Sequence, residues 1–137
     1  MSKKIIHSKE KWQEILPPDV FEVTRNHGTE RAFTGKYYAH TGSGTYKCSC
    51  CDNALFSSSH KYDSGSGWPS FYDIIEAGNV DLRRDYSHGM VRVEVLCGKC
   101  EAHLGHLFDD GPQPTGKRYC INSLSLDFAG DDNQQDE

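Results

Sequence analysis

Long apolar runs and an excess of basic residues are both missing from this 137-residue sequence. No segment is long and apolar enough to span a bilayer, and residues 1–7 carry two lysines but no apolar stretch of signal-peptide length. Lys and Arg number 15 against 20 Asp and Glu, which gives a formal net charge of −5. That balance argues against a nucleic-acid partner held by its phosphates. We therefore expect a cytoplasmic protein that binds neither membrane nor nucleic acid.

Apolar residues are also scarce, at 36% of the sequence. The length suits one domain with a modest core, which an additional stabilising element would help. The six cysteines could form disulfides, but Cys-x-x-Cys pairs in a chain without a secretory signal favour reduced thiols and a metal ion. A structural metal is therefore the expected stabilising element.

Two Cys-x-x-Cys pairs have the spacing of a zinc site. Four thiolates form a closed tetrahedral shell that suits Zn²⁺ and leaves no open position for catalysis, so we predict one structural zinc ion per chain. Its expected ligands are Cys48, Cys51, Cys97 and Cys100. The alternative is a disulfide or redox pair. Cys50 lies inside the first pair, and we interpret it as a bystander thiol.

The pattern of apolar residues predicts a mainly antiparallel β fold with one short N-terminal helix. The helix is expected over residues 8–16, with Ser8 as its N-cap and Pro17-Pro18 as its end. After it the signals change to those of strands and turns. Strands are predicted at residues 20–23, 33–39, 45–47, 80–82, 91–95 and 118–128, and a turn at 87–89.

The last predicted strand carries the one cysteine that follows both pairs. Period-2 alternation places Arg118, Cys120 and Asn122 on the same face. A guanidinium near a cysteine favours its reactive thiolate form, so Cys120 is a candidate nucleophile. The alternative is an inert buried thiol.

His103 and His106 follow Cys100 too closely for a Cys-Cys-His-His finger, which needs about twelve intervening residues. They are either hydrogen-bonded structural residues or partners of a nucleophilic thiol. Trp68 ends a Gly-rich loop, where it forms a pocket wall or fills the core.

Taken together, these motifs closely resemble the B-type methionine sulfoxide reductases, which act on methionine-R-sulfoxide. The resemblance covers residues 20–128, between an N-terminal helical segment at 1–19 and an acidic tail at 129–137 that we expect to be disordered. Besides the cysteine pairs, the matching stretches are 26–30, 33–35, 61–65, 67–71, 87–90, 102–106, 110–112 and 118–123.

The resemblance implies two small antiparallel sheets in a tent-like fold, joined by a zinc site far from the catalytic pocket. It also implies that Cys120 attacks the sulfoxide sulfur, giving methionine and a sulfenic acid. The family's pattern assigns further roles to the residues that match it here. His103, His106 and Asn122 would surround the sulfoxide oxygen, Trp68 would pack on the methyl group, and Asp110 and Arg118 would orient the histidines and assist the thiolate.

One position departs from the family pattern. Many members have a resolving cysteine where this chain has Ser66, and a serine cannot capture a sulfenic acid. Either the chain belongs to a subgroup in which thioredoxin or a small thiol attacks the sulfenic acid directly, or the serine was introduced. Cys50 would be a substitute only if the two thiols were close, and the family fold places it on the far side of the domain.

We therefore expect a monomeric, zinc-containing enzyme that reduces oxidised methionine in peptides, in proteins and as the free amino acid. A second hypothesis is a zinc-ribbon module that binds a protein or nucleic acid. That hypothesis explains the four zinc ligands but gives Cys120, His103, His106 and Trp68 no role.

Overall fold

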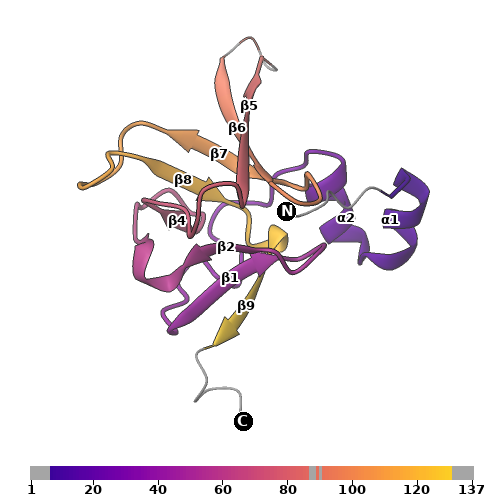
Figure 1. Ribbon diagram of the computed structural model, residues 1–137, viewed down its shortest axis with the longest axis horizontal. Coiled ribbons are helices and arrows are strands. Elements are labelled where there is room, and N and C mark those ends of the chain that lie inside the picture. The colour runs from indigo at the N-terminus through magenta and orange to yellow at the C-terminus, as the bar shows by residue number, and fades with distance from the viewer. Residues whose placement is uncertain (1–6, 87–88, 90, 131–137) are drawn as a thin grey trace.

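The computed structural model describes residues 7–86, 89 and 91–130. Within them the fold is mainly β, with two helices and two antiparallel sheets (Figure 1). The predicted fold class is therefore confirmed. In chain order the elements are α1 (Lys9–Ile15), α2 (Pro18–Arg25), β1 (Gly44–Cys48), β2 (Ala54–Ser57), the 3₁₀ turn η1 (Ser58–His60), β3 (Lys61–Tyr62), β4 (Ser70–Phe71), β5 (Val80–Asp85), β6 (Arg92–Cys97), β7 (His103–Phe108), β8 (Arg118–Ile121), the 3₁₀ turn η3 (Ser123–Ser125) and β9 (Leu126–Gly130).

The two sheets differ in size and share the core between them. The smaller has the order β2-β1-β9 and the larger the order β3-β4-β8-β7-β6-β5. Tyr46 of the smaller sheet meets Phe71 of the larger one edge to face, with ring centroids 5.1 Å apart, and Phe56 stacks on Phe71 at 4.4 Å. All three rings are fully buried. Aromatic burial across the gap between the sheets therefore stabilises the fold.

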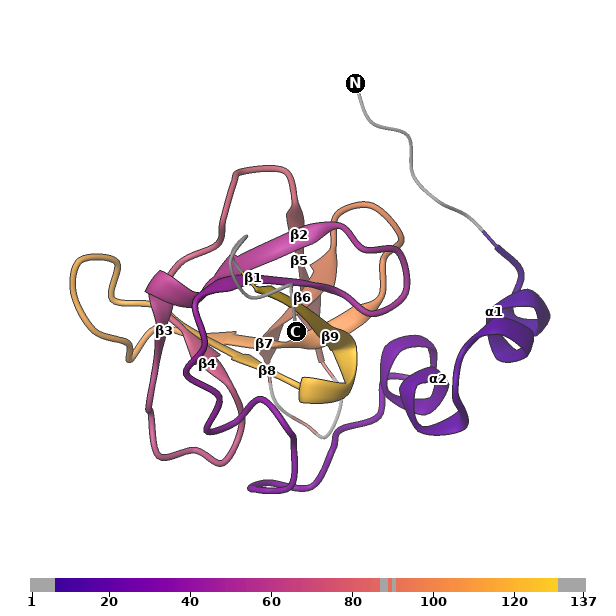
Figure 2. The same ribbon diagram turned by 90° about the horizontal axis from the view of Figure 1, so that it is seen from below.

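The N-terminal helix forms where the sequence predicts it. Ser8 caps α1, with its hydroxyl accepting a hydrogen bond from the Lys11 amide at 3.1 Å. Trp12 is the buried residue of the helix, and the guanidinium of Arg25 stacks on its ring at 4.3 Å. Both helices lie to one side of the sheets (Figure 2).

The strand predicted at residues 20–23 is wrong, because these residues belong to α2. Pro17-Pro18 does end the first helix, but Pro18 is also the first residue of the second. Proline suits that position because it needs no amide hydrogen there and its φ is already helical. Phe21 and Val23, which the pattern assigned to a strand, are buried side chains of this helix.

The strand predicted at residues 33–39 is also wrong. Phe33 has a φ of +69°, outside the extended region. The Tyr38 amide then bonds to the Gly35 carbonyl at 3.2 Å, and the His40 amide bonds to the Tyr37 carbonyl at 3.2 Å. Bonds between residues three apart make consecutive turns rather than a strand. The aromatic residues here favour a strand by composition, but Tyr37 packs against Tyr46 and Phe128 of the smaller sheet and Phe33 is largely exposed.

The final strand is divided between the two sheets. β8 belongs to the larger sheet, η3 turns the chain, and β9 enters the smaller sheet beside β1. Buried polar contacts mark the break: the Asn122 amide nitrogens of backbone and side chain both donate to the Leu104 carbonyl, and the Ser125 hydroxyl donates to the His103 carbonyl at 2.8 Å. The prediction of one continuous strand over residues 118–128 is therefore wrong at residues 122–125, whereas residues 126–128 are in a strand of the other sheet.

The predicted strands at 45–47, 80–82 and 91–95 are confirmed as β1, β5 and β6; β1 and β5 are longer than predicted, and β6 begins one residue later and extends to Cys97. Of the turn predicted between β5 and β6, residues 87 and 88 lie outside the described residues. Residues 131–137 of the predicted tail do so as well, whereas 129 and 130 belong to β9. None of the helices in the described ranges has the length and apolar character that a bilayer crossing requires.

Candidate active site and four-cysteine cluster

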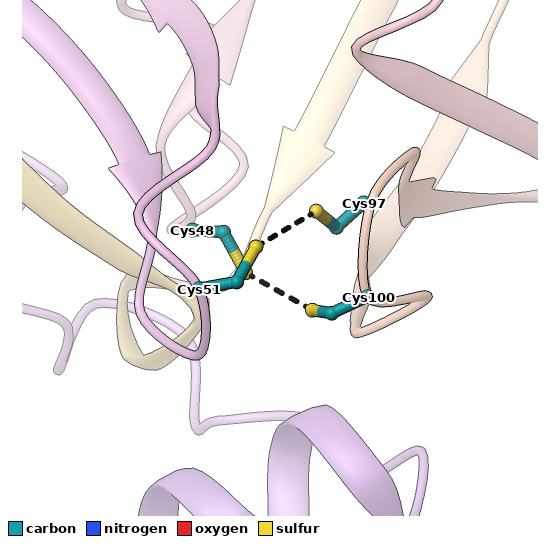
Figure 3. A group of neighbouring side chains, drawn as sticks. All are labelled: Cys48, Cys51, Cys97 and Cys100. Atoms are coloured by element: carbon teal, nitrogen blue, oxygen red, sulfur yellow. Dashed lines mark hydrogen bonds between the residues drawn. The ribbon is translucent and has the colours of Figure 1, made fainter. Parts of the chain in front are cut away.

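The four cysteines of the two Cys-x-x-Cys pairs converge at one point (Figure 3). β1 ends at Cys48 and β6 ends at Cys97, and the turn after each strand supplies the second cysteine. All four sulfur atoms lie within 4.8 Å of one another. The Sγ atoms of Cys48 and Cys100 are 3.6 Å apart, as are those of Cys51 and Cys97. The cluster joins the smaller sheet to the larger one.

The spacing of these sulfurs fits a metal ion. A tetrahedral ion with metal–sulfur bonds of about 2.3 Å requires sulfurs about 3.8 Å apart. Backbone amides of Cys50 and Lys99 donate to the sulfurs of Cys48 and Cys97, each at 3.4 Å, which stabilises the thiolate form of the ligands. The cluster could therefore hold a metal ion in a closed shell of four thiolates.

The N-terminal helices contact this cluster through one arginine. Arg25, at the end of α2, donates from Nη2 to the Cys100 carbonyl at 2.9 Å and to its sulfur at 3.3 Å. The same guanidinium stacks on Trp12 of α1. The helices thus brace the second cysteine pair from outside, a contact that the sequence patterns did not indicate.

Cys120 opens onto a different cavity, of about 290 Å³. β8 places Cys120 and Arg118 on the same face of the strand, half-buried, while Tyr119 and Ile121 point into the core. Five of the predicted site residues line this cavity together, with Phe108 as a further aromatic wall. They are Trp68, His106, Arg118, Cys120 and Asn122.

The other two predicted site residues, His103 and Asp110, lie outside that lining. His103 is only 3% exposed and sits behind His106, with ring centroids 5.5 Å apart. Asp110 is exposed and forms a two-point ion pair with Arg118, at 2.8 and 3.2 Å. This pair lowers the pKa of the Asp110 carboxyl and raises the pKa of the guanidinium. Asp110 therefore holds Arg118.

Each of the two histidines has a carboxylate partner that the sequence patterns did not reveal. Asp85 Oδ2 lies 2.9 Å from His106 Nε2, and Glu94 Oε2 lies 2.8 Å from His103 Nδ1. Both acids belong to the β5–β6 hairpin, which packs beside β7. A signal was present in the alternation of residues 91–95: Glu94 recurs with Arg92 on one face of β6, and in the sheet it is the register partner of His106.

Burial and these ion pairs set the protonation of the site. Burial lowers the pKa of His106, and its bond to Asp85 opposes this only in part. Burial acts to raise the pKa of Glu94, but the hydrogen bonds and charges of His103 and His27 outweigh it, so that the pKa is lowered. Glu94 is thus an ionised carboxylate in a buried position.

Comparison with known proteins identifies the family of this chain. The SelR domain family matches residues 16–130. The chain belongs to the SelR domain family. A protein named peptide methionine sulfoxide reductase MsrB from Acinetobacter baylyi is 52% identical over 98% of this chain and 96% of its own length. Proteins of the same name from Thioalkalivibrio sulfidiphilus and Hahella chejuensis are 58% and 53% identical, over 87% and 98% of this chain and 87% and 99% of their own lengths. The predicted resemblance to the B-type reductases is therefore confirmed.

Within the SelR fold of this chain, Ser66 lies directly beside the candidate nucleophile. Its Oγ is 3.5 Å from the Cys120 sulfur, and it also contacts Ser64 Oγ at 2.9 Å. The loop is held in place because Ser64 bonds to Ser70 on β4, at 2.7 Å, and β4 pairs with β8. The position at which the resemblance implies a resolving cysteine therefore adjoins Cys120 here, but it carries a hydroxyl.

The same loop fixes Trp68 in the SelR pocket. The indole nitrogen donates to the Glu30 carbonyl at 2.9 Å. The Glu30 backbone amide in turn donates to the side-chain oxygen of Asn122 at 2.9 Å, and the Glu30 carboxylate accepts a bond from the Leu124 amide at 3.0 Å. Trp68 remains half-buried, so it forms a wall of the cavity with one edge tied to the protein. Sequence reasoning missed buried Glu30, which links this wall to Asn122.

Proposed function

We propose that this chain reduces methionine-R-sulfoxide in peptides and proteins to methionine, with Cys120 as the nucleophile. The observation that carries the proposal is the shared cavity: a cysteine, an arginine, a histidine, an asparagine and a tryptophan from separate segments line one space. Membership of the SelR family, whose matched relatives bear the name peptide methionine sulfoxide reductase, supports the same activity.

In the proposed reaction the Cys120 thiolate takes the oxygen from the sulfoxide. The sulfur–oxygen bond of the substrate breaks, one proton is taken up, and the products are methionine and a Cys120 sulfenic acid. Cysteine sulfur is oxidised by two electrons and substrate sulfur is reduced by two. The oxygen leaves poorly unless it is protonated, so an acid must stand near it.

His106 is suited to supply that proton. It lines the cavity with Cys120, and Asp85 fixes its ring through Nε2. Asn122 lines the same wall; one hydrogen of its Nδ2 bonds to the Leu104 carbonyl, and the second is the one that would bond to the oxygen. Arg118, held by Asp110, brings a positive charge to the side of the cavity where the anionic sulfur attacks. His103 does not line the cavity; its ring packs against that of His106 and would orient it.

The aromatic walls suit the substrate's S-methyl group. Trp68 and Phe108 both line the cavity, and aromatic rings make favourable contacts with sulfur and methyl groups. The specificity for the R epimer is what the B-type family implies. We propose that the chain also reduces free methionine-R-sulfoxide.

We further propose that the four-cysteine cluster holds Zn²⁺ as a structural ion, one per chain. The donor set and sulfur spacing suit zinc, and the closed shell leaves no position for a substrate. Because Ser66 cannot form a disulfide, thioredoxin or a small thiol would reduce the sulfenic acid directly. We propose a cytoplasmic monomer, with residues 20–128 as the catalytic domain.

The test of this function is the substitution Cys120→Ser. It should abolish methionine formation while the circular dichroism spectrum and the bound zinc are unchanged. Cys50→Ser is the matched control and should remain active. Full turnover by the Cys120→Ser protein would refute the proposed mechanism and revive a non-enzymatic zinc-ribbon function.

A further inference from the structure

A second group of side chains that could hold a metal ion lies outside the four-cysteine cluster. It consists of His27, Glu94 and His103. Glu94 Oε2 is 2.9 Å from His27 Nδ1 and 2.8 Å from His103 Nδ1, so both rings address one carboxylate oxygen. The two imidazole rings are tilted by 54° with centroids 5.3 Å apart. Three different segments of the chain supply this group.

The backbone at His27 supports a role for its side chain. This residue follows the last turn of α2 with a φ of +59°, in the left-handed region. Glycine normally occupies such a position after a helix, and a residue with a side chain costs on the order of 1 kcal/mol there. The strained conformation holds the imidazole against Glu94, although the His27 side chain is 56% exposed.

We propose that His27, Glu94 and His103 bind one exchangeable divalent transition-metal ion of the Zn²⁺ or Co²⁺ class. Two imidazoles and a carboxylate are ligands that these ions prefer, in contrast to the four thiolates of the other cluster. The ion would bind Nδ1 of each ring, which requires the neutral imidazole with its proton on Nε2.

The geometry requires only a small outward movement. Ligand atoms about 2.0–2.2 Å from a tetrahedral ion lie about 3.3–3.5 Å apart, so the present contacts must lengthen by about half an ångström. The exposed side chain of His27 can supply that shift for its own contact with Glu94, and the contact between the buried Glu94 and His103 must lengthen through a small rotation of the carboxylate. Two of the three ligands, Glu94 and His103, thus already lie together in the interior, and the third, His27, can adjust at the surface.

A cavity of about 290 Å³ opens onto all three ligands and has room for water on the remaining coordination positions. Asp85, Arg84 and Arg92 also line it, and Arg92 is paired with Asp85 at 3.4 Å. The two guanidiniums oppose a cation and the two carboxylates favour it. We therefore expect an ion that exchanges with solvent and binds more weakly than the ion at the four-cysteine cluster.

The site would bear on the proposed function because His103 is shared. Its ring packs against His106 at the Cys120 cavity. An ion on Nδ1 would hold His103 in one orientation and bring a positive charge behind the cavity.

The experiment is a titration of the full-length Cys120→Ser protein, with zinc at the four cysteines, by Co²⁺. Removing the Cys120 thiol eliminates a competing ligand. Because this variant has no turnover, the result is independent of the proposed reductase activity. Calorimetry should show one Co²⁺ bound per chain. The absorption spectrum should show weak visible d–d bands and no sulfur-to-cobalt charge-transfer band.

Adding His27→Ala should weaken binding by about tenfold or more, and the exposed His7→Ala is the matched control that should leave it unchanged. Glu94→Gln should also abolish binding while keeping the shape of the side chain. If that buried substitution prevents folding, the surface variant at His27 still decides the question. Equal affinity with and without His27, or a charge-transfer band showing that Co²⁺ enters the thiolates alone, would overturn the proposal.

Discussion

The hydroxyl of Ser66 lies 3.5 Å from the sulfur of Cys120. A disulfide needs its two sulfurs about 2.05 Å apart, so a second sulfur at this position would have to approach by roughly 1.5 Å. The loop that carries Ser66 ends at β4, which pairs directly with the strand of Cys120. Residue 66 is therefore placed where a resolving cysteine could reach Cys120, but its hydroxyl cannot form a disulfide.

The substitution Ser66→Cys should give the enzyme an internal resolving thiol. After one equivalent of methionine sulfoxide, peptide mapping should find a disulfide between positions 66 and 120, whereas the unsubstituted protein should retain a sulfenic acid that dimedone traps. Ser64→Cys is the matched control on the same loop. A disulfide between Cys50 and Cys120 in the unsubstituted protein would instead show that Cys50 resolves the intermediate.

Trp68→Ala should lower kcat/KM by about 6- to 50-fold. The loss combines a sulfur–aromatic contact of about 0.3–1.5 kcal/mol with the burial of about one methyl group, worth about 0.8 kcal/mol. Steady-state kinetics with a methionine sulfoxide peptide measures it. Trp68→Phe retains an aromatic wall but loses the bond to the Glu30 carbonyl, so it should cost less. Equal losses in the two variants would mean that the hydrogen bond, and not the wall, is what matters.

Asp85→Asn should move the alkaline limb of the pH–rate profile to lower pH. The bond to Asp85 raises the pKa of His106 against the dominant effect of burial, which lowers it. Without that carboxylate the pKa falls further, and the proton-donating form of His106 is lost at a lower pH. The measurement is kcat/KM against pH for both proteins. A profile that does not move would remove His106 from the role of proton donor.

Chelation of the metal at neutral pH should unfold the domain rather than only stop turnover. The four-cysteine cluster joins β1 of one sheet to β6 of the other, so a metal bound there would contribute directly to the folding free energy. Circular dichroism during chelation tests this, and Cys97→Ser should have the same effect. Cys50→Ser should retain one zinc per chain by elemental analysis. A domain that stays folded after complete metal removal would contradict a structural role.

The candidate metal ligands and the candidate nucleophile were easier to predict from the sequence than the bounds of the helices and strands. The two cysteine pairs were recognisable because ligand spacing is a local property, and β1 and β6 deliver Cys48 and Cys97 as predicted. Alternation along β8 placed Cys120 and Arg118 on one face correctly. Each of these predictions depends on residues that are close in sequence.

The errors came from competition between local signals and distant contacts. A proline at position 18 is compatible both with the end of one helix and with the start of another. The burial of Phe21 in α2 accompanies the second arrangement, and the local sequence does not reveal that burial. The break after Ile121 depends on the bonds of Asn122 to Leu104, which lies on another strand. No pattern within residues 118–128 contains that information.

The alternation of residues 91–95 could have drawn attention to Glu94, but which acid meets which histidine could not be predicted from local patterns. Asp85 and Glu94 meet His106 and His103 through the register of β5, β6 and β7, and a one-residue change in register would turn them away. The family resemblance implied that Asp110 and Arg118 orient the histidines, but the Asp110 carboxylate pairs with Arg118.

The most direct measurement is methionine formation from the separate R and S epimers of a methionine sulfoxide peptide, with dithiothreitol as reductant. We predict reduction of the R epimer and not of the S epimer, and thioredoxin should then replace dithiothreitol without any substitution at Ser66. Reduction of neither epimer by the folded, zinc-loaded protein, or of the S epimer alone, would contradict the account.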